Sequence, residues 1–397
     1  MELNTATRPR GGGRRRGFGE RGPSGLGRLR RITLLAALLA LIPAAVSYLD
    51  ALSEPSNSSF GIRTVEWLRD HGAAGLVAQI ESAYYALTAP SKGGPTLRAL
   101  PSVGFGAGRG AAQGRAPAAI PTTQALAYRP PRVAPLLRPA LPGEGVWRAT
   151  RRVLEAEPPV LLTTLRNQPE YPRVVAGLAW IDTSRVTVTL NPGRLEPSVS
   201  LPRGTMDVPR PSRGRLLATF NSGFKLSDSR GGFVLGGHTY AAMRNGQATL
   251  VGYTDGRVDV VAWHYGPIAP GSVAFARQNL PLIAEEGRPT PNLANGEWGA
   301  TVGNAVLVWR SGVGIDRHGN LIYAAGSDQS AQSLADTLVH AGAVRAMELD
   351  INSYWVSFIT YGAPGAEAPG NLLPGMERSD TRYLEPDDRD FFAVYAR

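Results

Sequence analysis

The chain of 397 residues is long enough for one large domain or two ordinary ones, and its 43% hydrophobic content can supply a folded core. The net charge of +10 does not indicate a nucleic-acid groove, because the basic excess lies in residues 1–31 and 91–150 and the remainder is slightly acidic. The absence of cysteine excludes disulfides, thiolate metal sites and cysteine nucleophiles.

An uncharged apolar run over residues 32–49 is the first recognisable element, and it is near the lower limit for crossing a bilayer core of about 30 Å. Arginines fill the tail before it, residues 1–31, whereas Asp50 and Glu54 follow it. The positive-inside rule therefore predicts a single-pass anchor in the cell membrane, with the basic tail in the cytoplasm and the rest of the chain extracytoplasmic. A cleaved signal peptide is the alternative, although the long basic tail and the lack of an A-x-A site weigh against it.

Residues 50–90 are expected to form a membrane-proximal helical stalk. The apolar spacing between residues 64 and 87 is compatible with an amphipathic helix that is broken or weakened at Gly72 and Gly75. Residues 91–140 are dominated by Pro, Gly, Ala and Arg without apolar periodicity, which is typical of a disordered linker.

The remaining residues, 141–397, read as one domain of short β-rich runs separated by turn signals. Two strong hairpin signals, Asn245-Gly246 and Asp255-Gly256, join strand-like runs and predict a three-stranded antiparallel meander over residues 240–263. No repeat of 20 to 50 residues is visible, which argues against solenoids and propellers.

A strand, a helix and a further strand are predicted in order over residues 320–352. Ser330 is a suitable N-cap for the helix, and Gly342 is a suitable end. This order favours a βαβ unit with a right-handed crossover. The expected fold class is α+β: a mixed, largely antiparallel β-sheet domain with a βαβ unit near the C-terminus.

The last strand of this unit carries two carboxylates and an amide on one face. The alternation of side chains along a strand places Glu348, Asp350 and Asn352 on the same side. Carboxylates two residues apart on one face are separated by about 7 Å, close enough for one to raise the pKa of the other, as an acid/base pair requires. The alternative is a solvated strand face or a structural ion-paired cluster.

Arg310 precedes a glycine-rich run that includes Gly314. A guanidinium can hold a phosphate by two parallel hydrogen bonds, and glycines let the backbone approach a ligand closely. An arginine beside glycines is also common on surfaces. Asn221 and Gly223 lie where a strand meets a turn, and a turn with an apolar anchor explains them equally.

Histidines offer little support for a metal site. His238 and His264 lie beside aromatic residues without spaced partners, so packing or surface positions are favoured over metal ligation. No metal ligand is assigned, and the sequence identifies no cofactor. It contains no G-x-S-x-G elbow, Walker loop, H-E-x-x-H or EF-hand pattern.

Several short segments, taken in chain order, resemble the phosphodiester glycosidase (uncovering-enzyme) family over residues 215 to 360. The segment at residues 221–224 resembles the family's N-G-G-F element, residues 277–282 its q-s-G-P-x-L strand, and residues 310–316 its R-T-A-x-G-x-D element. Residues 330–350 are similar to the closing helix and the strand that ends in D-G-G-G.

The resemblance implies hydrolysis of a phosphodiester that links a sugar to phosphate. Asn221, Arg310 and Asp350 occupy the positions that match the family's motifs, so the resemblance implies a functional role for each of them. Ile351 and Asn352 replace two glycines of D-G-G-G, and Ser222 replaces the first glycine of N-G-G-F, as in a diverged branch. Together with the residue patterns above, the candidate catalytic residues are Asp350, Glu348 and Arg310, and the candidate substrate-binding residues are Asn221, Gly223, Asn352, Gly314 and His238.

The sequence therefore predicts a membrane-anchored extracytoplasmic hydrolase of a sugar phosphodiester in cell-envelope glycans. Its expected partners are a sugar-phosphate or envelope glycan and the membrane, and not nucleic acid. A non-catalytic domain that binds envelope glycan or polymer is the alternative, favoured by the lost glycines and by Tyr354 and Trp355 beside the predicted site. A structural role in an envelope complex is a third reading.

Overall fold

The structure is a computed structural model that describes residues 25–104, 128–150, 158–291, 293, 298 and 307–397. The chain divides into two compact units, residues 1–54 and 55–397. The first unit contains the helix α1 (Gly25–Ser53). By length and composition, its segment Arg28–Ser53 could cross a membrane, and its mean hydropathy is 2.3. A signal sequence meets the same criterion, so the anchor stays a prediction.

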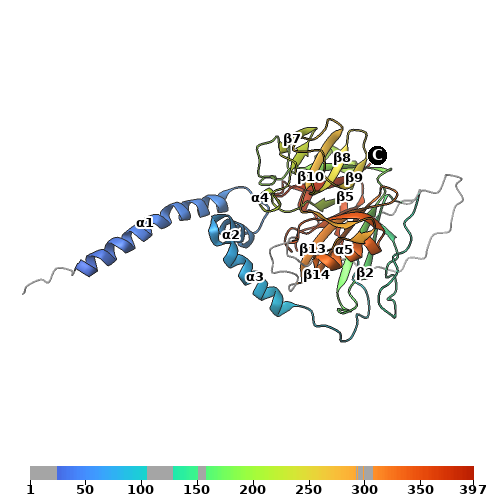
Figure 1. Ribbon diagram of the computed structural model, residues 1–397, viewed down its shortest axis with the longest axis horizontal. Helices are drawn as coiled ribbons and strands as arrows, with labels where there is room; N and C mark the ends of the chain where they lie inside the picture. Colours follow the sequence, from blue (N-terminus) through green and yellow to red (C-terminus); the bar gives the residue numbers. More distant parts are fainter. Residues whose placement is uncertain (1–24, 105–127, 151–157, 292, 294–297, 299–306) are drawn as a thin grey trace, which may run out of the picture. The chain divides into compact units, whose positions relative to one another are not determined.

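The second unit begins with two helices joined by a kink. α2 (Phe60–Leu68) is capped by the Ser59 side chain, and α3 (Ala74–Thr88) follows the π-type turn η1 (Arg69–Ala73). Gly72 adopts φ of 89°, a left-handed conformation that glycine reaches without a Cβ clash. The break predicted at Gly72 is confirmed. We call α2, η1 and α3 together the helical pair (Figure 1).

The rest of the unit is built from antiparallel strands in three sheets, so the fold is α+β with mostly antiparallel sheets (Figure 1). The eight-stranded sheet has the order β1 (Arg148–Ala149), β2 (Val160–Arg166), β3 (Val175–Ile181), β14 (Leu321–Gln329), β13 (Val308–Asp316), β15 (Ala343–Glu348), β11 (Leu282–Glu285) and β12 (Arg288–Pro289). The first five-stranded sheet has the order β7 (His238–Ala241), β6 (Phe233–Leu235), β10 (Val273–Gln278), β8 (Ala248–Tyr253) and β9 (Val258–Ala262). The second has the order β17 (Glu367–Asn371), β16 (Phe358–Ala363), β5 (Leu216–Asn221), β18 (Phe391–Ala396) and β4 (Val186–Asn191). Short helical segments complete the unit: η2 (Arg210–Arg215), α4 (Leu226–Ser229), α5 (Ala331–His340) and η3 (Arg382–Leu384).

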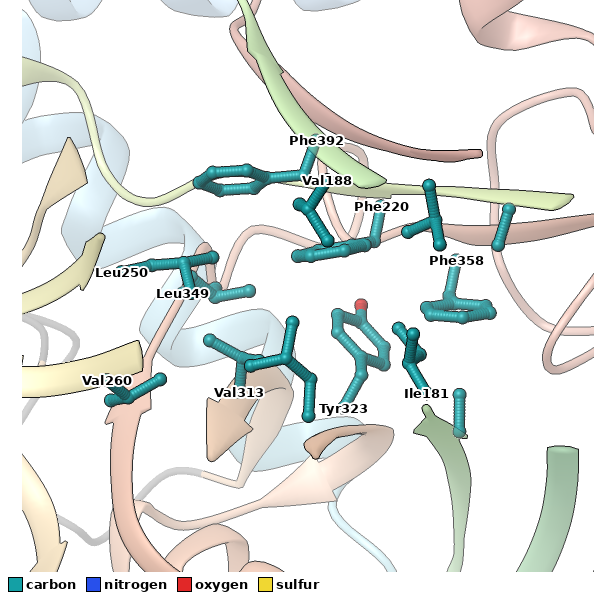
Figure 2. Packing of buried hydrophobic residues seen from close by; sticks show 14 of the residues in the cluster. Ile181, Val188, Phe220, Leu250, Val260, Val313, Tyr323, Leu349, Phe358 and Phe392 are labelled. Carbon is teal, nitrogen blue, oxygen red and sulfur yellow. The ribbon is translucent and has the colours of Figure 1, made fainter. Parts of the chain in front are cut away.

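The main core is formed by residues from all three sheets. Phe220 on β5 packs with Phe392 on β18 at a ring distance of 5.1 Å and with Tyr323 on β14 at 5.6 Å. Figure 2 shows Tyr323 and Phe220 facing each other among the aliphatic residues of the cluster. The Asp350 amide donates to the Ser222 carbonyl at 3.1 Å, so the carboxyl ends of β5 and β15 lie close to one another, and both segments contribute to the site described below.

The strand–helix–strand order predicted over residues 320–352 is present as β14, α5 and β15. Ser330 caps α5 in a capping box with Ser333. β14 and β15 do not pair with each other, because β13 lies between them and is antiparallel to both. α5 packs on this sheet (Figure 1). The handedness of the crossover stays a prediction.

The predicted three-stranded meander is half correct. β8 and β9 form the hairpin at Asp255-Gly256, but β7 pairs with β6 and is separated from β8 by two strands. The chain near Asn245-Gly246 makes other bonds: the Arg244 amide donates to the Gln278 side chain and the Gly246 amide to the carbonyl of Trp263. These tertiary bonds replace a local hairpin.

Much of the segment predicted as a linker contacts the β-rich body. The Gly93 amide donates to the carbonyl of Glu170, the Gly104 amide to that of Asn371, and the Val133 amide to that of Gly145. Residues 105–127, the centre of that segment, lie outside the described residues, as do residues 1–24 of the predicted tail. The domain boundaries stay predictions.

Candidate functional site

A cavity of about 310 Å³ lies between the helical pair and the chain that follows β15. The helical pair supplies Glu66, Arg69, Asp70, Ala74, Ala78, Glu81 and Tyr85, and the β-rich body supplies Phe224, Lys225, Asp228, Val308, Asp350, Ile351, Asn352, Trp355 and Arg389. Two of the predicted site residues, Asp350 and Asn352, therefore line one cavity.

Asp350 is a buried carboxyl that lines this cavity. Its Oδ2 accepts a hydrogen bond from Arg389 Nη2 at 2.7 Å, and its Oδ1 accepts from the Asn352 amide at 3.0 Å. Burial raises the pKa of Asp350 above its usual value, and the charge of Arg389 opposes this effect. A carboxyl that faces a cavity with a raised pKa is suited to exchange a proton with a ligand.

The guanidinium of Arg389 is held by a buried group of side chains. It also donates to the Gly223 carbonyl at 3.0 Å, and it lies 5.2 Å from the Trp355 ring centroid. Arg382 stacks on the same ring at 5.2 Å and makes two hydrogen bonds to Asp387, of 2.7 and 2.9 Å. Trp355 is thus enclosed by cations and is not an open platform for a sugar ring.

Lys225 is the second cation of the body at the cavity. Its ammonium forms ion pairs with Glu66 of α2 and with Asp70 of η1, the latter at 3.3 Å. Burial lowers the pKa of Lys225, but the charge and hydrogen bond of Glu66 and the charge of Asp70 together outweigh this effect and raise the pKa overall. The Lys225 ammonium, which would attract an anionic ligand, is therefore already paired with a carboxylate of the helical pair.

Asn221 lies beneath Asp350 but does not reach the cavity. Its amide nitrogen donates to Ser311 Oγ at 3.0 Å, and Ser311 Oγ donates to the Asp350 carbonyl at 2.7 Å. Its amide oxygen accepts from the Tyr323 hydroxyl and from the Ser357 amide. Asn221 fixes the backbone that carries Asp350 and has no hydrogen-bonding atom left for a ligand.

Arg310 and Glu348 form a buried ion pair of 2.5 Å outside the cavity lining. Burial raises the pKa of Glu348 to about 7, while Arg310 acts to lower it and Asp350 adds a smaller increase. The raised carboxyl pKa expected from alternation is thus present, but burial is its main cause. Arg310 also donates to the carbonyls of Gln329 and Trp298, which leaves its guanidinium in a structural arrangement.

The other predicted substrate-binding residues divide into two groups. Gly223 lies beside the site, where a Cβ would come within 2.9 Å of the Asn279 side chain. The predicted role of Gly314 in substrate binding is corrected: Gly314 is a packing position in the sheet, since a Cβ there would lie 2.7 Å from the Ala343 side chain. The predicted role of His238 is corrected in the same way, because His238 is exposed on β7 beside Tyr240 and does not line the cavity.

The cavity is rich in acid. Five carboxylates line it against three cations, and three of those carboxylates come from the helical pair. Without the helical pair, the body presents Lys225 and Arg389 against Asp228 and Asp350. Among the described residues, no group of three or more His, Cys, Asp or Glu is arranged to hold a metal ion.

No family model matches the chain. No curated protein matches it either. Among solved structures, the chain is similar to the catalytic domain of zebrafish N-acetylglucosamine-1-phosphodiester alpha-N-acetylglucosaminidase auto-inhibited by pro-peptide, with 14% identity and a TM-score of 0.40 over 63% of this chain and 87% of that one. It is similar to a protein from Synechocystis with 16% identity and a TM-score of 0.35, over 60% of this chain and 64% of that one. A Burkholderia pseudomallei protein named as exported shares 11% identity with a TM-score of 0.26, over 58% and 75% of the two chains. Membership of the phosphodiester glycosidase family stays a prediction.

Sequence reasoning missed most of the charged cavity lining. Lys225 is one of only two lysines in the chain, and Arg389 belongs to an Asp-Asp-Arg-Asp run just before the apolar strand β18. All four residues of that run are buried, and four adjacent charges beside a strand are a usable signal for a buried ionic site. Glu66 and Asp70 had no local signal, since their partner Lys225 is distant in sequence.

Proposed function

We propose that the second unit hydrolyses a sugar phosphodiester in the cavity between α3 and Asp350. The observation that carries the proposal is the position of Asp350: a buried carboxyl with a raised pKa that lines a cavity next to Arg389 and near Lys225. Proton transfer by Asp350 and binding of phosphate oxygens by the two cations are the functions that these groups can perform. The sequence resemblance to phosphodiester glycosidases is consistent with this assignment.

In the proposed reaction, water adds to the anomeric carbon of the sugar as the bond from that carbon to the phosphate oxygen breaks. Asp350 takes the proton of the attacking water, and Lys225 and Arg389 hold the departing phosphomonoester. Phosphate must first displace the carboxylate of Glu66 from Lys225, so binding requires the Glu66 side chain to move. Arg310 and Glu348 are assigned a positioning role, because Glu348 ends the strand that leads to Asp350 and Arg310 pairs with it from the neighbouring strand β13.

The proposed location is the outer face of the cell membrane, with α1 as the anchor. The apolar run and the arginines before it support this topology through the positive-inside rule. Envelope glycans that carry phosphodiesters are then the accessible substrates, and nucleic acid is not an expected partner.

A non-catalytic domain that binds an envelope glycan or polymer is the second candidate. Two observations favour it: both carboxylate oxygens of Asp350 are occupied, and the cavity lining is acidic overall. A domain of this kind would bind its ligand without proton transfer.

The test is to incubate the purified full chain, in detergent, with a panel of sugar phosphodiesters and to measure free sugar by chromatography and binding by calorimetry. The proposal predicts release of sugar from at least one donor. Binding without release across the panel selects the second candidate. Neither binding nor release contradicts both.

A further inference from the structure

Helix α3 turns mainly small and polar residues toward the cavity and most of its large apolar residues outward, with Val77 as the one buried exception. Ala74, Ala78, Glu81 and Tyr85 line the cavity. On the outer side, the side chains are largely exposed: Leu76 is 60% exposed, Ile80 62%, Tyr84 62% and Leu87 87%. With about 100° between successive residues of a helix, these two sets lie on different faces, with mean directions about 135° apart.

Apart from the buried Val77, this arrangement is the reverse of a normal surface helix, which buries its apolar side and exposes its polar side. Glu81 is the only charged residue of α3, and it faces the cavity. The four exposed residues therefore form an uncharged stripe along the helix, which we call the outer stripe. A continuous apolar surface of this kind marks a contact with another apolar surface.

The chain connection favours a lipid bilayer as the partner. Only six residues separate the end of α1 at Ser53 from the start of α2 at Phe60. A fully extended chain of that length reaches about 25 Å at most. Part of this length is fixed on the body, because Ser56 and Ser58 both donate hydrogen bonds to Asp388. If α1 spans a membrane, the helical pair is held close to that membrane's surface.

The side chains of the region suit the membrane interface. Phe60, at the start of α2, is 68% exposed, and Tyr84 combines an apolar ring with a hydroxyl, as aromatic residues at the headgroup level do. The outer stripe has no arginine or lysine, so apolar insertion and not attraction to anionic lipid would provide the contact.

We propose that the outer stripe of α3 lies in the interfacial region of the lipid bilayer, which places the cavity on the opposite side of the same helix next to the membrane surface. The inference rests on the proposed anchoring by α1 and is independent of whether the cavity is catalytic. It implies that ligands of the cavity are groups carried at or near the membrane surface.

The absence of cysteine from the chain permits a direct test. Single substitutions Ile80→Cys and Leu87→Cys on the outer stripe are each labelled with an environment-sensitive fluorophore, and the full chain is reconstituted in phosphatidylcholine vesicles. Vesicles whose lipids carry bromine on the acyl chains are compared with unbrominated vesicles. Thr254→Cys, at an exposed position after β8, is the matched control.

The proposal predicts at least about twofold quenching by brominated lipid at positions 80 and 87 and none at position 254. No quenching at either stripe position overturns it. Disulfide-linked dimers of the unlabelled stripe variants, without quenching of the labelled ones, overturn it in favour of a second copy of the chain. Extraction at alkaline pH reports separately whether α1 anchors the chain, and sugar release reports separately whether the cavity is catalytic.

Discussion

Replacing Asp350 by asparagine is expected to lower the rate of sugar release from a phosphodiester donor by at least about 100-fold, the low end of general acid–base catalysis. Asparagine keeps an oxygen that can accept the hydrogen bond from the backbone amide of Asn352. It cannot take a proton, however, and it removes the negative charge that faces Arg389. The measurement is the initial rate at saturating donor for the two full-length chains.

A matched control separates loss of chemistry from loss of fold. Glu144 is another buried carboxylate in an ion pair, with Arg166 at 2.7 Å, and it does not line the cavity. Glu144→Gln is expected to lower the thermal midpoint while retaining most of the turnover. If Asp350→Asn turns over donor at the rate of the unaltered chain, the proposed role of Asp350 is wrong.

The second large effect is expected on stability, at Asp387. This carboxylate is fully buried and bonds Arg382 through both oxygens, with Arg378 as a further partner at 3.2 Å. Asp387→Ala leaves two buried guanidinium groups without their counter-charge, so the free energy of unfolding should fall by about 3 to 5 kcal/mol. Denaturant unfolding of the two chains measures the difference.

The same substitution has a predictable dependence on pH. Burial alone would raise the pKa of Asp387, but the charge and hydrogen bonds of Arg382 lower it to about 2, from an ordinary value of 3.8. A depressed folded-state pKa contributes stability that is present above the ordinary value and lost as the pH falls through 2. The difference between the two chains should therefore shrink as the pH falls from about 4 toward 2.

Glu170, in an exposed pair with Lys92, is the surface control for this experiment. Glu170→Ala is expected to change the unfolding midpoint little, because exposed ion pairs contribute little to stability. Equal effects of Asp387→Ala and Glu170→Ala would contradict the view that the buried ion pairs of Asp387 stabilise the fold.

Elements with strong local signals were predictable from the sequence. Asp255-Gly256 specifies its hairpin through the turn itself, and Ser330 caps α5 through a bond to a residue three positions away. The position of β7 was not predictable, because its neighbours depend on the tertiary bonds of the Gln278 side chain to the Gly232 and Arg244 amides.

The candidate site was predictable only in part, for the same reason. Alternation along one strand identified Asp350, which lines the cavity. It also placed Glu348 with Asp350, yet Glu348 is withdrawn into an ion pair with Arg310. The residues that give the cavity its charge, such as Arg389 and Glu66, come from opposite ends of the chain, and no local pattern relates them to Asp350.

Ligand binding between α3 and Asp350 is the central requirement of the proposed function. Ala78→Cys on the cavity side of α3 and Ala83→Cys on its exposed side allow the same bulky maleimide to be attached to either face of one helix. The adduct at position 78 is expected to abolish sugar release, whereas the adduct at position 83 should leave it near the unmodified rate. Full release with position 78 blocked would contradict the proposed function.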